Sequence, residues 1–167
     1  YIQTVDGTDL LVTSDLVEGR AKAWSNVSGI KAGGASFAGE DFILLRGSKT
    51  TQALGYKGRF EFTAAFSYDL KKEKVKQLLV GTDDLYPAQS GLGWITGFSE
   101  GGRKVYMPAF MGRTSPPPNH LLGVDLATGR GAMSARGSRY TLDWIVAPDG
   151  TILGREEMSN DIKGGLL

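Results

Sequence analysis

The sequence predicts an all-β protein, and three observations support this fold class. Short apolar or alternating runs recur along the chain, and Gly, Pro, Asn and Asp residues bound them. Glycine is frequent, with 24 among 167 residues, about twice its average share of ~7%. Amphipathic segments with the helical spacing i, i+3, i+4 and i+7 are scarce.

The strands that we expect follow one another along most of the chain. They cover residues 42–45, 60–66, 105–107, 121–124, 144–146 and 152–153. Residues 70–80 form the best helical candidate, because strong helix formers there carry an apolar trio. We favour a lysine-rich turn followed by a short strand, since residues 66–75 resemble residues 122–130, where an Asp-Leu pair also precedes a polar turn.

Two segments align as hairpins with an acidic-glycine turn. The first covers residues 92–107 and the second residues 142–153, and their Trp-Ile pairs begin at Trp94 and Trp144, 50 positions apart. Asp-Gly and Gly-Gly pairs tolerate the positive φ that a tight hairpin requires. A fainter copy of the same hairpin covers residues 35–44.

A second feature also recurs. An Asp-Leu pair followed by a polar turn begins at Asp69 and again at Asp125, 56 positions later. A period near 50 residues with four strands per unit is typical of a β-propeller blade. We therefore expect about three blades of a partial propeller, in approximate residues 1–55, 56–110 and 111–167, and no catalytic domain.

Composition excludes several classes of function. Nineteen basic and eighteen acidic residues leave a net charge of +1, so neither nucleic acid nor a membrane surface is an expected partner. No apolar stretch approaches the ~18 residues of a membrane-spanning helix. The absence of cysteine excludes disulfides, thiol catalysis and Cys-based metal sites, and the single histidine excludes multi-His metal sites. We expect no cofactor and no metal.

Residues 97–101 match the G-x-S-x-G pattern of a nucleophile elbow. An elbow needs a strand, a strained turn at the serine and then a helix. The residues after Ser99 include two glycines, several β-formers and Pro108, which are poor helix formers. Ser99 is therefore expected in a hairpin turn. His120, which follows three prolines, is the one possible histidine base, and we expect it to pack in a loop instead.

The remaining motifs are weaker, and we expect no catalytic, cofactor-binding or metal-binding residue in this chain. Residues 47–50 lack the upstream glycine of a phosphate loop, and residues 91–93 lack the third glycine of a dinucleotide fingerprint. Adjacent acidic pairs do not have the spacing of a calcium loop. A lysine cluster is interleaved with Glu73, which favours a solvated turn over a nucleic-acid patch.

Residues 97–106, followed by 122–129, resemble the grammar F-S-x-D-G-x-x-V-Y … L-x-x-V-D-L-x-T-G of TolB-like propellers. They are most similar to the amino-terminal propeller of prolyl-oligopeptidase-family serine peptidases, including the dipeptidyl-peptidase and acylaminoacyl-peptidase branches. The resemblance covers about residues 30–155. It implies a non-catalytic cap that gates the access of short peptides to an α/β-hydrolase domain carrying the catalytic triad. This chain departs from the family because it has no hydrolase domain.

Two other functions stay open. The chain is alternatively a segment of a stand-alone TolB-like or WD-like propeller that binds or scaffolds proteins. An independent small β-enzyme is the least supported, because neither Ser99 nor His120 has a second catalytic partner. We expect the chain to be an excerpt of a longer protein, because it begins at Tyr1 without a leader.

An open stack of three blades leaves apolar end faces. Further blades, a second fragment or a second copy in a homo-oligomer are expected to cover them, and the α/β-hydrolase domain of the parent chain is a separate expected partner. A periplasmic or secreted location and a cytoplasmic one, in a bacterium, stay equally open.

Overall fold

The computed structural model describes residues 1–28, 31–52 and 57–158, apart from the side chains of residues 22–25. The described residues form β-strands, turns and one short 3₁₀ segment, without an α-helix, which confirms the all-β class. No helix in this part of the chain is long and apolar enough to cross a membrane.

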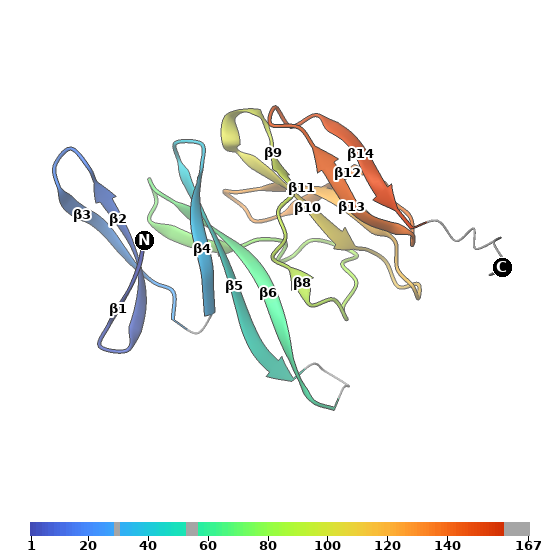
Figure 1. The fold of residues 1–167 in the computed structure, drawn as a ribbon, viewed down its shortest axis with the longest axis horizontal. Coiled ribbons are helices and arrows are strands. Elements are labelled where there is room, and N and C mark those ends of the chain that lie inside the picture. The colour runs from blue at the N-terminus through green and yellow to red at the C-terminus, as the bar shows by residue number, and fades with distance from the viewer. Residues whose placement is uncertain (29–30, 53–56, 159–167) are drawn as a thin grey trace, which may run out of the picture.

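The strands form successive antiparallel sheets whose neighbours follow chain order (Figure 1). The first sheet contains β1 (Ile2–Val5), β2 (Thr8–Asp15) and β3 (Arg20–Asn26). The second contains β4 (Lys31–Ala38), β5 (Phe42–Gln52), β6 (Arg59–Asp69) and β7 (Lys74–Gln77). The third contains β9 (Gly97–Phe98), β10 (Lys104–Phe110), β11 (Asn119–Asp125) and β12 (Gly131–Ala135). The fourth contains β13 (Thr141–Val146) and β14 (Ile152–Glu157), and β8 (Gly91–Leu92) pairs with β6 in parallel.

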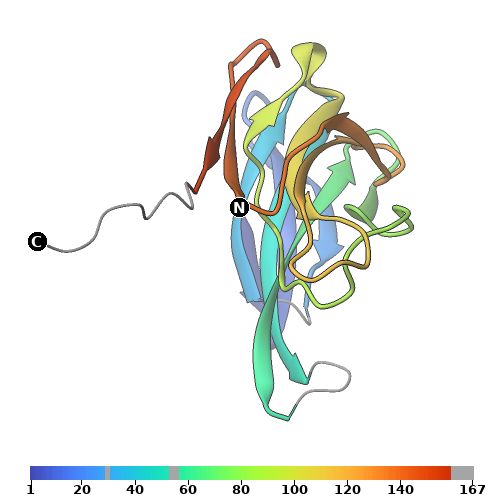
Figure 2. The ribbon, with the colours of Figure 1, turned by 90° about the vertical axis from the view of Figure 1, so that its right-hand side faces the viewer.

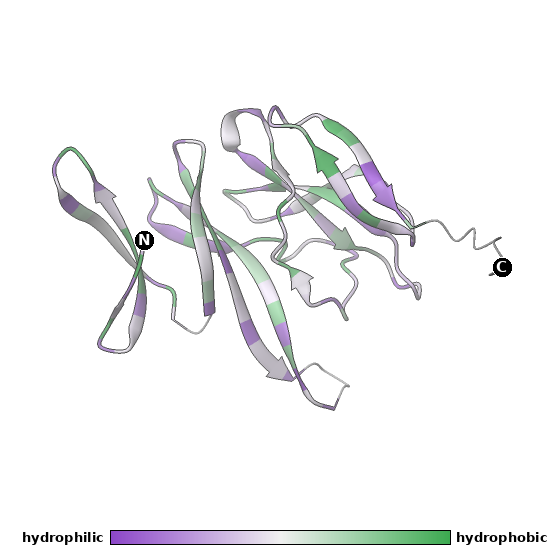
Figure 3. Ribbon diagram, in the orientation of Figure 1, coloured by the Kyte–Doolittle hydropathy of each residue, from purple (hydrophilic) through white to green (hydrophobic). Residues whose placement is uncertain are grey.

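Strand β5 shows how the sheets stack. Its Leu44 belongs to the buried cluster that includes residues of the third sheet, whereas the next residue, Leu45, belongs to a second cluster with Leu11 of the first sheet. Successive side chains of a strand point to opposite faces, so the second sheet is buried between the first and the third. Hydrophobic and hydrophilic residues are accordingly mixed along single strands (Figure 3). In the view of Figure 2, the first two sheets lie behind the last two.

The larger core lies between the second and third sheets. Its buried members are Ala38, Phe42, Leu44, Ala65, Leu78, Leu79, Val105, Met107, Ala109, Met111, Leu122, Val124 and Leu126. A buried hydrogen bond crosses the same interface, because Ser67 Oγ of β6 donates to the main-chain oxygen of Leu126 at 2.6 Å. An unpaired buried carbonyl is costly, so this bond helps to fix the position of one sheet against the next.

The two Asp-Leu turns have the same geometry, and residues 70–80 contain a turn and the short strand β7 instead of a helix. Asp69 Oδ1 accepts the main-chain N–H groups of Lys71 and Lys72 at 3.0 and 2.9 Å. Asp125 Oδ1 accepts the main-chain N–H of Thr128 at 2.8 Å. Each turn also closes with a main-chain bond from the fourth following residue to the aspartate oxygen, at 2.8 Å in both.

The structure contains a third copy of this turn, which the sequence analysis missed, between β2 and β3. Asp15 Oδ1 accepts the N–H of Val17 at 2.8 Å and that of Glu18 at 3.1 Å, and Gly19 N–H donates to Asp15 O at 2.9 Å. The three aspartates, Asp15, Asp69 and Asp125, are 54 and 56 positions apart. The first three sheets therefore repeat the same aspartate turn at nearly constant spacing.

The predicted hairpins at 35–44 and 142–153 are confirmed as β4–β5 and β13–β14. The hairpin predicted at 92–107 is shorter than expected, because β9 contains only Gly97–Phe98. Residues 94–96 lie outside any strand. The chain reaches this point from β8, which pairs with β6, and Thr96 Oγ1 donates to the main-chain oxygen of Trp144 at 2.7 Å.

The sheets divide the chain at other points than the blade boundaries that we expected. Positions 55 and 56 lie in the connection of β5 with β6, outside the described residues. Position 110 is the last residue of β10 and position 111 follows it, within the β10–β11 hairpin. The β-sheets instead change after β3, after β8 and after β12. The second sheet has four consecutive antiparallel strands, β4–β7, with β8 as a fifth strand beside β6, and the third sheet has the four strands β9–β12.

The first hairpin turns of successive sheets approach each other closely through glycine. A Cβ placed on Gly102, in the β9–β10 turn, would lie 2.6 Å from the nitrogen of Gly39 in the β4–β5 turn. A Cβ on Gly150, in the β13–β14 turn, would lie 2.9 Å from Phe98 O. Real Cβ atoms do not approach main-chain atoms so closely, so glycine lets these turns pack together.

Candidate functional site

Ser99 lies in the β9–β10 turn, as the sequence predicts. Its Oγ accepts the main-chain N–H of Lys104 at 3.1 Å, and its own N–H donates to Lys104 O at 3.0 Å. The 3₁₀ segment Glu100–Gly102 follows, with Gly101 at a left-handed φ of 75°. A nucleophile elbow requires an α-helix at this point, so Ser99 closes a hairpin.

His120 is the second residue of β11 and does not lie in the extended loop where the sequence analysis placed it, although its side chain packs against the connection that follows β12. Its Nδ1 accepts the main-chain N–H of Gly137 at 2.9 Å. Partial burial, together with the positive charge of Arg136, lowers the pKa of His120 below its ordinary value. The neutral ring therefore carries its hydrogen on Nε2, and its Nδ1 fixes the connection between β12 and β13.

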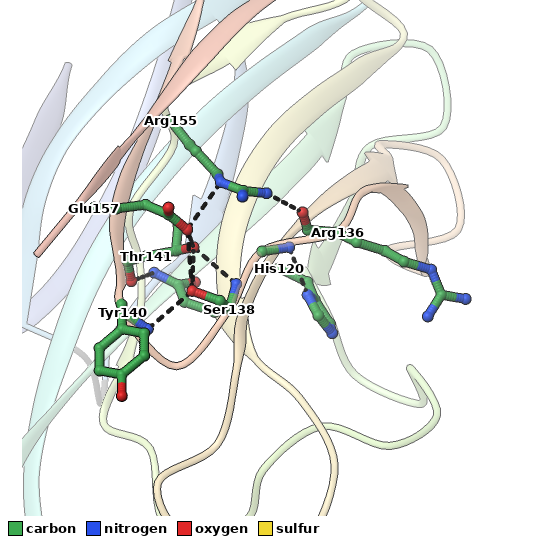
Figure 4. A network of polar contacts seen from close by, with 9 residues as sticks. His120, Arg136, Ser138, Tyr140, Thr141, Arg155 and Glu157 are labelled. Atoms are coloured by element: carbon green, nitrogen blue, oxygen red, sulfur yellow. Dashed lines mark hydrogen bonds and ion pairs between the residues drawn. The ribbon is translucent and has the colours of Figure 1, made fainter. Parts of the chain in front are cut away.

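A polar network that the sequence analysis missed surrounds the same connection (Figure 4). Glu157 Oε1 accepts hydrogen bonds from Ser138 Oγ at 3.0 Å and from Thr141 Oγ1 at 3.1 Å. It also pairs with Arg155 Nε at 2.9 Å. The bond from Ser138 is the largest cause that lowers the pKa of Glu157, and the Thr141 hydroxyl and the Arg155 charge act in the same direction.

This network holds a serine, a histidine and a carboxylate, but they do not form a catalytic triad. In a triad, the histidine accepts the serine proton and donates its other N–H to the carboxylate. Here the Ser138 hydroxyl donates to Glu157 directly, and His120 Nδ1 is occupied by the Gly137 amide. The network therefore positions residues 136–141 and does not activate a nucleophile.

The charged motifs lie in turns and strands. Lys71 Nζ pairs with Asp41 Oδ1 at 2.7 Å, which raises the pKa of Lys71. Lys72 Nζ lies 3.5 Å from Asp69 Oδ2. Residues 47–50 lie within β5 and residues 91–92 form β8, so neither begins a helix. Within residues 1–28, 31–52 and 57–158, no three His, Asp or Glu side chains form a group that could hold a metal.

A cleft among the described residues has a volume of about 780 Å³. It lies at the end of the third and fourth sheets where β10 ends and where β11 and β13 begin, opposite the Asp125 turn. Three segments that are distant in the sequence line it: residues 86–94, residues 108–119 and residues 139–143. We call this feature the loop-end cleft.

Large apolar side chains are exposed in the loop-end cleft. Trp94 is 53% exposed, Phe110 41% and Leu142 50%. Gln89 braces one wall, because its Nε2 donates to the oxygens of Tyr86 and Phe110 and its Oε1 accepts the Phe110 N–H, each at 3.0 Å. The apolar wall is therefore held by hydrogen bonds on both sides of Phe110.

Polar side chains also line the cleft. Asn119 is buried, and its Nδ2 donates to the main-chain oxygens of Leu142 at 3.2 Å and Thr141 at 3.4 Å. Its Oδ1 has no partner among the described residues. The guanidinium of Arg139 stacks over the ring of Tyr140, 4.7 Å from its centroid. A largely apolar cleft with a few fixed polar groups suits ligand binding.

The sequence analysis assigned the aromatic residues to packing between sheets, and it could not identify Trp94 as exposed. Gly91 and Gly93, on both sides of Leu92, were the available signal, because β8 ends at Leu92 and Trp94 lies outside any strand. No known protein family, curated protein or solved structure matches this chain.

Proposed function

We propose that this chain is a non-catalytic portion of a β-propeller, and that it caps an α/β-hydrolase domain and gates the access of peptides to it. The observation that carries the proposal is the stack of sheets in chain order, with one aspartate turn repeated at 54 and 56 positions. A propeller consists of four-stranded antiparallel units that pack face to face in this manner.

The candidate nucleophiles and the candidate base have structural roles, which supports a non-catalytic function. Ser99 and Ser138 use their hydroxyl groups within turns, and His120 holds the amide of Gly137. The resemblance to prolyl-oligopeptidase-family propellers supplies the peptidase context. In that context, acyl transfer from a peptide bond to a serine takes place in the hydrolase domain.

A stand-alone propeller that binds proteins or peptides is the second candidate. The loop-end cleft favours it, because residues of this chain alone build a cleft of about 780 Å³ with exposed Trp94. Such a site needs no hydrolase domain for binding.

Labelling with a fluorophosphonate tests both candidates on the source protein and on this chain. The capping proposal predicts that the source protein is labelled on a serine outside residues 1–167 and that this chain stays unlabelled. A source protein that stays unlabelled while a serine esterase control reacts would refute the capping role and favour the stand-alone binder. Labelling of Ser99 or Ser138 would overturn the non-catalytic function itself.

A further inference from the structure

We propose that the loop-end cleft binds the C-terminal residue of an extended peptide. The peptide carboxylate lies at Arg139, and its terminal apolar side chain lies against Trp94 and Leu142. This inference deepens the proposed function and rests on it, because it names the ligand of a non-catalytic propeller portion.

Arg139 is the group that would bind the carboxylate. It lines the cleft and is exposed, and it forms no ion pair with any residue that the structure describes. Stacking over Tyr140 and a hydrogen bond from Nη2 to the Tyr140 hydroxyl orient its guanidinium. An oriented guanidinium retains further N–H donors that match the two oxygens of a carboxylate.

The apolar side chain of the ligand has a place beside this charge. Leu142 is three residues from Arg139, and both line the same cleft as Trp94 and Phe110. These three apolar residues remain 41–53% exposed, so a ligand side chain can bury part of their surface. Aromatic side chains supply large contact areas at binding sites, which favours a phenylalanine or leucine at the end of the peptide.

Asn119 connects the two parts of the site. Its main-chain N–H donates to Ser138 O at 3.1 Å, and its side chain donates to Leu142 O, so it lies between the residues that flank Arg139. Its Oδ1 is buried and unpartnered among the described residues. This buried oxygen is closed off from the open cleft, so Asn119 contributes to the site by holding Ser138 and Leu142 in place through its donors.

Asp143 narrows the choice of ligand further. It lines the cleft one residue after Leu142, and its Oδ1 accepts only the neighbouring main-chain N–H of Trp144, at 2.8 Å. A negative charge in the same cleft as Arg139 repels a doubly charged anion such as phosphate more strongly than a singly charged one. A single carboxylate attached to an apolar group therefore meets less repulsion from Asp143.

Isothermal titration calorimetry tests the proposal by comparing the binding of N-acetyl-Gly-Phe to this chain with the binding of its amide, N-acetyl-Gly-Phe-NH₂. We expect saturable binding of the free acid and at least about tenfold weaker binding of the amide, because a charged hydrogen-bonded pair is lost. The peptide N-acetyl-Asp-Phe-NH₂ distinguishes a side-chain carboxylate from a terminal one. Equal affinity for the three peptides, or tightest binding of the aspartyl amide, would overturn the proposal.

Variants then test the assigned residue. Arg139→Gln should weaken binding of the free acid at least about tenfold and leave the affinity for the amide unchanged. The affinity of Arg139→Lys for the free acid should lie between those of Arg139→Gln and the unmodified chain. Arg130→Gln is the matched control, because Arg130 is an exposed arginine in the turn at the opposite end of the third sheet. Thermal unfolding checks that each variant folds. If Arg139→Gln fails to fold, the comparison of acid with amide on the unmodified chain still decides.

Failure of this inference is distinguishable from failure of the proposed function. Fluorophosphonate labelling of Ser99 or Ser138 would remove the non-catalytic function. Equal binding of acid and amide by an unlabelled chain would remove only the assignment of Arg139 and of the peptide C-terminus.

Discussion

Adjacent glycines in the β9–β10 turn allow a direct test of the contact between successive sheets. Gly101 and Gly102 both have positive φ, at 75° and 64°. A Cβ on Gly101 would meet nothing within 4 Å, whereas a Cβ on Gly102 would lie 2.6 Å from the nitrogen and 2.8 Å from the Cα of Gly39. The two alanine variants therefore share the backbone cost and differ in the clash with the neighbouring sheet.

The expected magnitudes follow from this difference. A left-handed alanine costs about 1–2 kcal/mol, and we expect this loss in the free energy of unfolding of Gly101→Ala. Overpacking adds about 1–3 kcal/mol, so Gly102→Ala should lose that much more. For a chain of this size, the additional loss lowers the melting temperature by about 2–12 °C. Urea and thermal unfolding followed by circular dichroism measure both variants, and equal losses would refute the packing of this turn on the β4–β5 turn.

Three further predictions concern single side chains. Ser67→Ala leaves the buried oxygen of Leu126 unpaired and should lower the free energy of unfolding by about 1–3 kcal/mol. The control Ser48→Ala removes an exposed bond to Glu61 and should change the free energy of unfolding by less than about 0.5 kcal/mol. Equal losses of the two variants in urea unfolding would contradict the role of Ser67. Asp69→Ala and Asp125→Ala each remove the acceptor of a turn, and each should lower the free energy of unfolding by a similar amount, about 0.5–2 kcal/mol. A loss for only one of the two variants in the same assay would contradict the equivalence of the two turns. Because the pKa of His120 is lower in the folded state, its contribution to stability is complete above pH ~6.5 and is lost as the pH falls through the folded-state pKa. The melting temperature should therefore decrease between pH 7 and pH 5. In His120→Gln this decrease should be smaller.

The sequence predicted local structure well where a chemical cause acts within a few residues. Asp69 and Asp125 accept main-chain N–H groups two or three residues later, so the polar turns follow from the sequence around them. The two glycines between Ser99 and Arg103 likewise indicated a hairpin instead of an elbow. The matching turn at Asp15 was equally visible in the sequence, in Asp-Leu-Val-Glu-Gly-Arg, and was missed.

The sequence could not predict the features that depend on pairing between distant segments. Residues 92–96 resemble the strand at 142–146, but β8 pairs in parallel with β6, and no pattern within residues 92–96 indicates this distant partner. The loop-end cleft combines residues such as Gln89, Asn119 and Arg139, which are separated by 20 or more positions. Whether Trp94 packs inside or faces a ligand depends on these loops, so the sequence alone could not place it.

The central claim is that the first and third sheets pack on the two faces of the second sheet. Nuclear Overhauser effects from the neighbouring leucines of β5 test this claim most directly. Methyl nuclear Overhauser effects from Leu44 should connect it to the cluster with Val105 and Leu122, and those from Leu45 should connect it to Leu11. Contacts of both leucines with the same neighbouring sheet would contradict the stack, and with it the propeller that we propose.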